Sequence, residues 1–271
     1  MIMTKILEKM SLLGLSLLLI SAFSISTALP PMLDYYSPTY NASQVELLVS
    51  VPSFSVVAML LLNPFVDKWL NDRQLIMTGL ILLSSAGIFP FFVQWYPLVL
   101  LSRLVFGMGI GFINAKAISI ISQRYQGKER IQMLGIRGSV ELIGGASCSL
   151  LVGQLLKIHW TLAFLIYGFG FIILAMYLLF VPPMEQIEKK EIQKSKQGLN
   201  KKDFAMILGM ALLSGFVICI NSSISLRVPL FQVASKTIES GQSALVLSLE
   251  QGIGIVAGLS FASLIGHFKN R

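Results

Sequence analysis

Charge is scarce in this chain. Charged residues make up only 13% of its 271 residues, against about 25% in an average soluble domain. Hydrophobic residues supply 55%, and the mean hydropathy is +0.76. A soluble globule could not cover so much apolar surface with so few charges, so that class is excluded. The 2 cysteines exclude a disulfide framework, and the 22 glycines follow no collagen-like repeat. The composition therefore indicates an integral membrane protein.

The signatures of common enzyme chemistry are also missing. The sequence has neither a phosphate-binding loop nor a Gly-x-Ser-x-Gly nucleophile elbow. His159 and His267 stand far apart, and no cluster of Cys and His has the spacing of metal ligands. We therefore expect no enzymatic activity, no cofactor and no metal. The net charge of +8 suggests nucleic acid in a soluble protein, but here the basic residues lie in loops between membrane spans, and no nucleic-acid partner is expected.

Long uncharged runs predict the helices. A bilayer core of about 30 Å needs about 20 apolar residues per helix, and only helices or closed barrels satisfy the backbone in lipid. The sequence predicts an all-α membrane protein with about eight spans, over residues 10–33, 44–66, 74–93, 97–122, 133–156, 160–182, 204–230 and 243–266. The first run is too long for a typical signal peptide, and we expect it to remain as a helix.

The basic residues predict the orientation. Apart from Arg103 and Lys116 deep in the fourth span, only Lys157, Arg227 and Lys236 fall on one side of the membrane. All the other Lys and Arg residues fall on the side of the two termini. Cytoplasmic loops carry such an excess of basic residues. We expect a multi-pass protein of the plasma membrane with both termini in the cytoplasm.

An internal repeat suggests the domain plan. Displacing the chain by 199 residues aligns residues 24–71 with 223–270 without a gap, with nine identities in 48 positions. Parallel repeats of this kind form the two halves of one class of transporters. We predict a six-helix bundle at 1–183, a cytoplasmic linker at 184–203, and an incomplete two-helix bundle at 204–271.

Two short motifs point to a family. Residues 63–71 read Asn-Pro-Phe-Val-Asp-Lys-Trp-Leu-Asn in the loop after the second span. They resemble the Gly-x-Leu-x-Asp-Arg-x-Gly-Arg-Arg signature of the major facilitator superfamily, with Asp67 and Lys68 at its charged positions. Residues 103–107, Arg-Leu-Val-Phe-Gly, are similar to the Arg-x-x-Gln-Gly signature of proton-driven members, with Phe106 in place of Gln. The order and spacing of these motifs match the family along the whole chain.

The resemblance implies a bundle of the major-facilitator type, with two helical halves that rock about a central site. Only two helices of the second half are present here, so the chain resembles a C-terminally truncated relative of the drug:proton antiporters. Asp67 and Lys68 would form the gating loop, but the late helix on which that Asp usually acts is absent. The resemblance also implies that the fifth and eighth spans touch across the two halves.

Four ionisable residues lie deep within the predicted spans: Arg103, Lys116, Glu141 and Glu250. Such groups are costly in a bilayer and mark functional sites. Each glutamate heads a stripe of small residues spaced by four, which lets helix backbones approach closely. The stripes are Gly145, Ser149 and Gly153 after Glu141, and Gly254, Gly258, Ala262 and Gly266 after Glu250. We therefore expect both acids at helix–helix contacts.

These groups are candidates for proton coupling, namely Glu141, Glu250 and Arg103. A proton taken up by a carboxylate at a moving interface changes the free energy of closing that interface. The alternative for Glu141 is a neutralising ion pair, with Lys116 as its charge partner. The alternative for Arg103 is a side chain that only reaches the membrane surface. The candidates for lining a substrate cavity are Ser24, Asn114, Asn221 and Ser225, although such groups more often bond helix to helix.

The predicted function is secondary transport of a small solute across a lipid bilayer, most simply proton-driven efflux of an amphipathic compound. Nutrient uptake by a member of the same superfamily is the nearest alternative. A truncated product without transport activity, a half-protein that needs a second chain for further helices, and a membrane scaffold or sensor remain open. The DNA beyond the stop codon would distinguish truncation from a finished protein.

Overall fold

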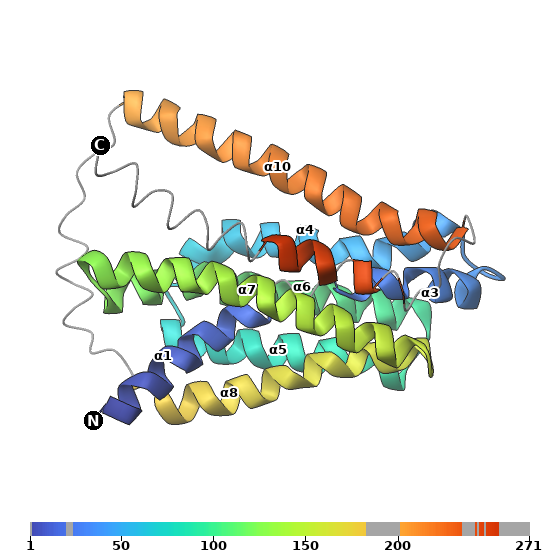
Figure 1. The fold of residues 1–271 in the computed structure, drawn as a ribbon, viewed down its shortest axis with the longest axis horizontal. Coiled ribbons are helices and arrows are strands. Elements are labelled where there is room, and N and C mark those ends of the chain that lie inside the picture. The colour runs from blue at the N-terminus through green and yellow to red at the C-terminus, as the bar shows by residue number, and fades with distance from the viewer. Residues whose placement is uncertain are drawn as a thin grey trace.

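The fold was analysed in a computed structural model of the chain, which describes residues 2–19, 24–182, 201–234, 242, 244–246 and 248–254. Every regular element in these residues is a helix (Figure 1). The elements are α1 (Ile2–Leu17), η1 (Ile25–Ala28), α3 (Leu29–Tyr36), α4 (Ala42–Val66), α5 (Asp72–Phe92), α6 (Tyr96–Arg124), α7 (Gly127–Leu156), η2 (Trp160–Gly168), α8 (Phe169–Phe180) and α10 (Lys201–Ala234).

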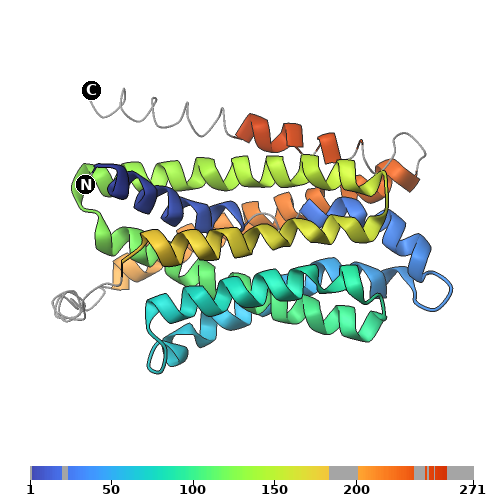
Figure 2. The ribbon, with the colours of Figure 1, turned by 90° about the horizontal axis from the view of Figure 1, so that it is seen from below.

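The helices run along the long axis of the molecule, so that their connections gather at two opposite ends (Figure 2). One end holds Tyr36 and the connections after α3, α5 and α7, and we call it the Tyr36 end. The other holds Asp67 and the connections after α4 and α6, and we call it the Asp67 end. This alternation of chain direction is what a series of spanning helices with short loops requires.

Five helices in the described residues are long and apolar enough to cross a membrane. They are Ala42–Val66, Asp72–Phe92, Tyr96–Arg124, Glu129–Leu156 and Trp160–Phe180. Ala205–Ile220 within α10 and Ala244–Gly254 are shorter apolar helices. The predicted all-α membrane fold is confirmed, and these five helices match the second to sixth predicted spans. The linker at 184–200 and most of the eighth span lie outside the described residues.

The first predicted span is different in the structure. Instead of one helix over 10–33, α1 begins at Ile2, and η1 and α3 continue the path from Ile25 to Tyr36. Pro30 and Pro31 lie in the first turn of α3, where their missing N–H groups break no helical hydrogen bond. Charge alone could not reveal where α1 ends or where α3 begins, because both boundaries fall within one uncharged run.

Two helix starts follow from side chains that serve as caps. Asn41 accepts a hydrogen bond from the backbone of Gln44 at 2.9 Å, and the Gln44 side chain accepts one from the Asn41 backbone at 3.0 Å. This reciprocal arrangement satisfies the free N–H groups of the first turn. The backbone of Asn71 donates to Gln74 in the same way at 3.0 Å, and α5 begins there.

The start of α7 corrects another predicted boundary. The fifth span was expected to begin at residue 133, but the helix begins at Gly127, whose φ of +55° favours glycine. Charged residues at 128–130 form its first turn. A helix satisfies its own backbone in water as well as in lipid, so the first charge marks the edge of the apolar span and not the end of the helix.

Glycines allow α4, α5 and α6 to pack closely. A Cβ on Gly107 of α6 would lie 2.3 Å from the carbonyl oxygen of Pro52 on α4. On the other face of α6, a Cβ on Gly109 would lie 2.6 Å from the backbone nitrogen of Leu83 on α5. Such contacts place the three helix backbones almost against each other, and this tight layer positions the charged residues described next.

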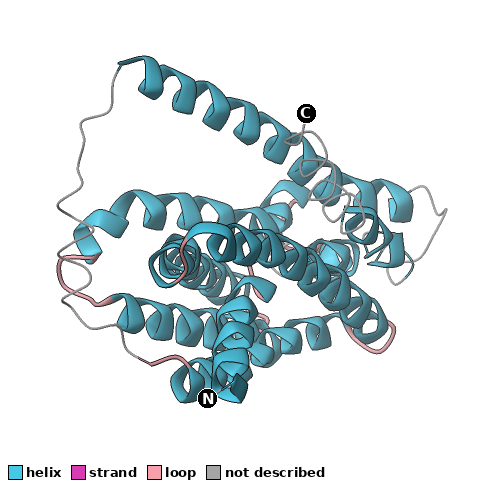
Figure 3. Ribbon diagram, turned by 60° about the vertical axis from the view of Figure 1, so that its left-hand side comes forward, coloured by secondary structure: helices cyan, strands magenta, loops and turns pink. Residues whose placement is uncertain are grey.

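Helix α10 lies obliquely across this bundle. Its N-terminal half stands away from the other helices, whereas its C-terminal half approaches them at the Tyr36 end (Figures 1 and 3). There it contacts η1 and α3. All described side chains of α10 are exposed.

Candidate functional site

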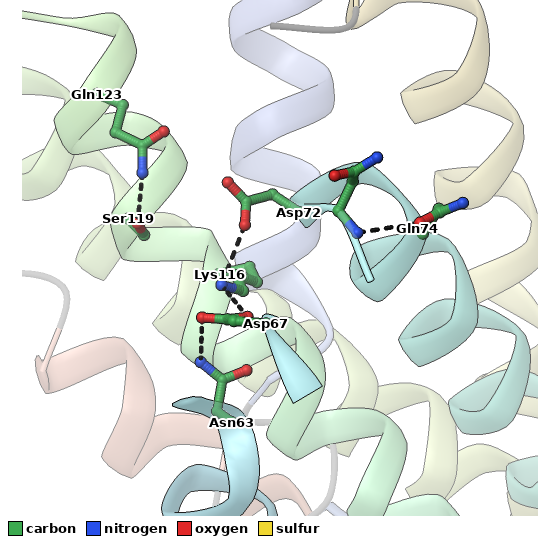
Figure 4. Close-up of polar contacts among 8 residues, drawn as sticks. Asn63, Asp67, Asp72, Gln74, Lys116, Ser119 and Gln123 are labelled. Carbon is green, nitrogen blue, oxygen red and sulfur yellow. Dashed lines mark hydrogen bonds and ion pairs between the residues drawn. The ribbon is translucent and has the colours of Figure 1, made fainter. Parts of the chain in front are cut away.

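Lys116 holds together the loop between α4 and α5. Its Nζ lies 2.5 Å from Oδ1 of Asp67 and 3.0 Å from Oδ1 of Asp72. Asn63 donates from Nδ2 to Asp67 at 3.3 Å. Figure 4 shows these side chains converging from three helices. We call Asn63, Asp67, Asp72 and Lys116 the loop cluster.

The loop cluster follows from the positions of its members on their helices. Asp67 caps the C-terminus of α4, and Asp72 is the first residue of α5. Lys116 lies eight residues before the end of α6 at Arg124, and its side chain is 7% exposed. A buried ammonium requires a negatively charged partner, and here two carboxylates of the same loop provide it.

The structure assigns Lys116 a different partner from the expected one. The sequence suggested Glu141, but Lys116 binds Asp67 and Asp72. Asp67 thereby has a contact inside its own bundle, which the resemblance did not imply. Lys68 remains exposed, with its ammonium 5.4 Å from the ring centroid of Phe65. Sequence analysis missed Asp72, although its five-residue distance from Asp67 across a short loop was a usable signal.

Arg103 lies inside the bundle and does not reach the surface. Only 1% of the residue is exposed. Its guanidinium carbon lies 4.7 Å from the ring centroid of Phe106, 5.0 Å from that of Phe164 and 5.5 Å from that of Tyr167. Aromatic faces attract a cation at such distances. The predicted alternative, an arginine that extends to the membrane surface, is wrong.

The hydrogen bonds of Arg103 explain its place. Its Nη2 donates to the carbonyl oxygens of Ala86 and Gly87 on α5, each at 3.0 Å. Pro90 lies within α5 and has no N–H for the carbonyl four residues earlier. That carbonyl belongs to Ala86, so Arg103 supplies the donor that the proline removes. Arg103 Nε and Nη1 have no hydrogen-bond partner among the described residues.

Glu141 and Arg137 form a pair in the middle of α7. Arg137 Nη1 lies 3.5 Å from Glu141 Oε2, one turn apart on the helix. The side chains are 13% and 28% exposed, respectively. Glu141 lies fourteen residues from Gly127 and fifteen from Leu156, or about 21 Å from either end of the helix. Since charged residues at 128–130 precede the apolar part of α7, the pair lies in the half of the predicted fifth span that is nearer the Asp67 end.

The segment of the eighth span that the structure describes packs along α7. Ser248 donates from Oγ to the carbonyl of Ala146 at 3.3 Å. A Cβ on Gly254 would lie 3.4 Å from Leu142. The expected contact between the fifth and eighth spans is therefore present. Glu250 lies between Ser248 and Gly254 and is half-buried.

Ser24 serves a contact between helices. The residue is fully buried, and its Oγ donates to the carbonyl of Gly145 at 3.4 Å and accepts from Ser149 Oγ at 3.2 Å. This is the helix-to-helix bonding that the sequence left open as an alternative. Asn114 is half-buried on α6. The side chains of Asn221 and Ser225 lie outside the described residues.

Further ion pairs fasten the Asp67 end. Arg124 of α6 pairs with Glu8 of α1 and donates to the backbone carbonyl of Pro182 after α8. Lys9 donates to Glu129 of α7 at 2.6 Å, and this hydrogen bond raises the pKa of Lys9 above its ordinary value. These pairs join the ends of four helices. In the part of the chain that the structure describes, His, Cys, Asp and Glu form no group of three suited to a metal.

Comparison with known proteins indicates the same class of protein as this geometry. The sequence pattern of the Major Facilitator Superfamily matches residues 12–271. The chain is 22% identical over 282 aligned positions to "Multidrug resistance protein MdtL" of Shigella dysenteriae serotype 1 (strain Sd197), with 95% of this chain and 68% of that protein covered. The identity and coverage are the same for the MdtL of Escherichia coli O81 (strain ED1a).

Solved structures show the same fold. A bacterial homologue of the human lysosomal transporter Spinster, inward-facing and unoccupied, superposes with a TM-score of 0.69 at 18% identity, over 96% of this chain and 62% of that one. A structure from a study of proton-dependent oligopeptide transporters gives a TM-score of 0.55 at 16% identity, over 96% and 54%. The chain thus spans less than two thirds of the length of these two proteins. The chain belongs to the Major Facilitator Superfamily, a family of membrane transporters and not of enzymes.

Proposed function

We propose that this protein exports a small amphipathic solute from the cytoplasm, driven by a proton gradient, by alternating access of a site between its two helical parts. The sequence similarity to multidrug resistance proteins supports the direction and the class of solute. The excess of basic residues at the Asp67 end supports a cytoplasmic location of that end and of both termini in the plasma membrane. The division into 1–183, 184–203 and 204–271 remains part of this proposal.

The observation that carries the proposal is the Arg137–Glu141 pair in α7. It lies within the apolar span of α7, the helix against which the eighth span packs. With Glu141 ionised, Arg137 has its counter-charge. When Glu141 takes up a proton, the ion pair is lost and Arg137 carries an uncompensated charge in a region of low dielectric, which is costly.

This difference can couple a proton to the transport cycle. A ligand shifts a conformational equilibrium only through its differential affinity for the two states. A conformation that admits water to α7 would tolerate the unpaired Arg137, whereas one that closes the interface with the eighth span would require the ion pair. Proton uptake at Glu141 would therefore favour opening, and proton release would favour closing. Glu250, on the facing segment, is a second group that could exchange the proton. Arg103 of α6 instead donates hydrogen bonds to carbonyls of α5.

The test is gradient-driven transport by Glu141→Gln, with the cationic dye ethidium as the probe in proteoliposomes that contain a pH-sensitive dye. Glutamine keeps the size of the side chain and cannot release a proton. We expect the variant to insert normally and to exchange ethidium down its concentration gradient, but to show no response to an imposed pH gradient. The matched control is Asp34→Asn, which removes an exposed carboxylate at the Tyr36 end. Full gradient-driven transport by Glu141→Gln would contradict the proposal.

We also propose that the active unit includes a second chain that supplies further helices. Supporting this, the described apolar side chains of α10 are exposed, among them Met210 at 64% and Phe216 at 67%. A photo-crosslinker placed at Phe216 in native membranes should form a covalent product with a second polypeptide. Crosslinking to lipid only would contradict this part of the proposal and would favour the transport-inactive alternative if ethidium transport is absent as well.

A further inference from the structure

Among the described residues, the contacts of α10 and of the eighth-span segment with the N-terminal bundle lie from mid-depth toward the Tyr36 end. Helix α10 contacts η1 and α3 at that end. Ser248 reaches Ala146, which lies ten residues before the end of α7 at Leu156, or about 15 Å from it. Toward the Asp67 end, α10 diverges from the bundle (Figures 1 and 3). The structure is therefore closed at the Tyr36 end.

An ion pair joins α10 to the N-terminal bundle in this closed region. Arg227 Nη1 lies 3.4 Å from Glu46 Oε1. Glu46 is in the second turn of α4, and Arg227 lies seven residues before the end of α10 at Ala234. The Glu46 side chain is 22% exposed and that of Arg227 is 68% exposed.

We propose that Glu46 and Arg227 form an outer latch, an ion pair that stabilises the conformation closed at the Tyr36 end and must break when that end opens. Glu46 is on α4 of the N-terminal bundle, and Arg227 is on α10 of the other helical part. Rocking of the two parts therefore separates the two residues directly. The inference rests on the proposed alternating-access function, since a latch has a role only if this end opens.

The expected size of the effect is modest. An ion pair between partly exposed side chains shifts a two-state equilibrium by about two- to fivefold. Charge reversal at one position replaces this attraction by repulsion, so we expect the population open at the Tyr36 end to rise by at least that factor. A small latch suits a transporter, because a much stronger pair would trap it in one conformation.

The experiment measures the distance between α4 and α10 by double electron–electron resonance in lipid nanodiscs. Spin labels are attached at Leu47→Cys and Phe231→Cys, since these side chains are 41% and 75% exposed. Cys148 and Cys219 are first replaced by alanine. The variants are Glu46→Arg, Arg227→Glu, and the exchange of both charges in one chain. We expect a longer-distance population in each single variant and its return to the starting level in the double variant.

Two controls complete the design. Asp34→Arg reverses an exposed acid at the same end outside the pair and should leave the distances unchanged. Labels at Leu47→Cys and Trp95→Cys, both within the N-terminal bundle, should report one unchanged distance in every variant that is folded. Unchanged distances in both single variants would overturn the latch. Longer distances that the double variant does not reverse would also overturn it, because the effect would then not come from the pair.

The outcome is separable from that of the proposed function. The distance measurement needs neither a solute nor a gradient. If charge reversal opens the Tyr36 end but no ethidium transport is found, the latch stands and the proposed export fails. If Glu141→Gln abolishes the response to the pH gradient while the distances remain unchanged in the single variants, the export mechanism stands and the latch fails.

Discussion

At the scale of single residues, a proline and an arginine on neighbouring helices complement each other. Pro90 leaves the carbonyl of Ala86 without its helical donor, and Arg103 donates to it from α6 at 3.0 Å. The rest of the guanidinium faces three aromatic rings. Arg103, which belongs to a segment similar to a family signature, thus also has a structural role. Proton coupling and this structural role predict different effects of mutation.

The structural role of Arg103 can be tested by a double-mutant cycle. Arg103→Met should lower the free energy of unfolding by about 1–3 kcal/mol, because a buried carbonyl loses its donor. In the Pro90→Ala background, the new N–H of residue 90 can serve Ala86, so the same substitution should have a clearly smaller effect. Unfolding titrations in mixed micelles measure both. Equal losses in the two backgrounds would show that Arg103 acts elsewhere.

Lys116 offers a second test at this scale. Lys116→Met removes the cation that Asp67 and Asp72 share. Because Asp67 is partly exposed, we expect a loss of about 1–3 kcal/mol, below that of a fully buried pair. Asp72→Asn in the Lys116→Met background should recover part of this loss by removing one negative charge. Hydrogen exchange at residues 67–71 should increase in the single variant, and protection equal to that of the unchanged protein would contradict the role of Lys116.

At the scale of elements, backbone contact between helices determines the shape of the bundle. The sequence shows glycines in the fourth span, but not which neighbour each one faces. The structure places Gly107 against Pro52, so α4 and α6 meet where a proline has already interrupted the hydrogen bonds of α4. By contrast, Gly135 in α7 has open space around the position of a Cβ.

These two glycines give a matched prediction. Gly107→Ala should separate α4 from α6 and lower the free energy of unfolding by about 1–3 kcal/mol, because its Cβ would overlap a carbonyl oxygen. Gly135→Ala should be neutral or stabilising by up to about 1 kcal/mol, because alanine is the better helix former. Melting temperatures of the two purified variants in one detergent compare them directly. Similar melting temperatures would mean that α4 can move away at little cost.

At the scale of the whole molecule, the predicted orientation places the Asp67 end in the cytoplasm. Trp95 at the Tyr36 end and Trp69 at the Asp67 end are 63% and 88% exposed. A cysteine at Trp95 should react with a membrane-impermeant maleimide on intact cells, and one at Trp69 only after permeabilisation, both in a background in which Cys148 and Cys219 are alanine. The reverse pattern would show that the basic loops face outward and would overturn the direction of the proposed export.

The sequence by itself determined the membrane class, the approximate spans and the family. Each depends on local properties of the sequence. A run such as 74–93 is apolar whatever it packs against, and the motif around Asp67 is recognised from the adjacent residues alone. The contact between the fifth and eighth spans also followed, through the resemblance and the small residues after Glu141. Helix boundaries were less visible, because α1 ends and α3 begins within one uncharged run.

Only the tertiary structure decided the partners of the charges. Lys116 binds Asp67 and Asp72 and not Glu141, Arg103 binds carbonyls of α5, and Glu46 meets Arg227 of a distant helix. Helical periodicity gives the direction of a side chain around its own axis, but not the identity of the helix that lies there. An ion pair or hydrogen bond needs its two atoms within about 4 Å, and such distances are fixed by the packing of helices far apart in the chain.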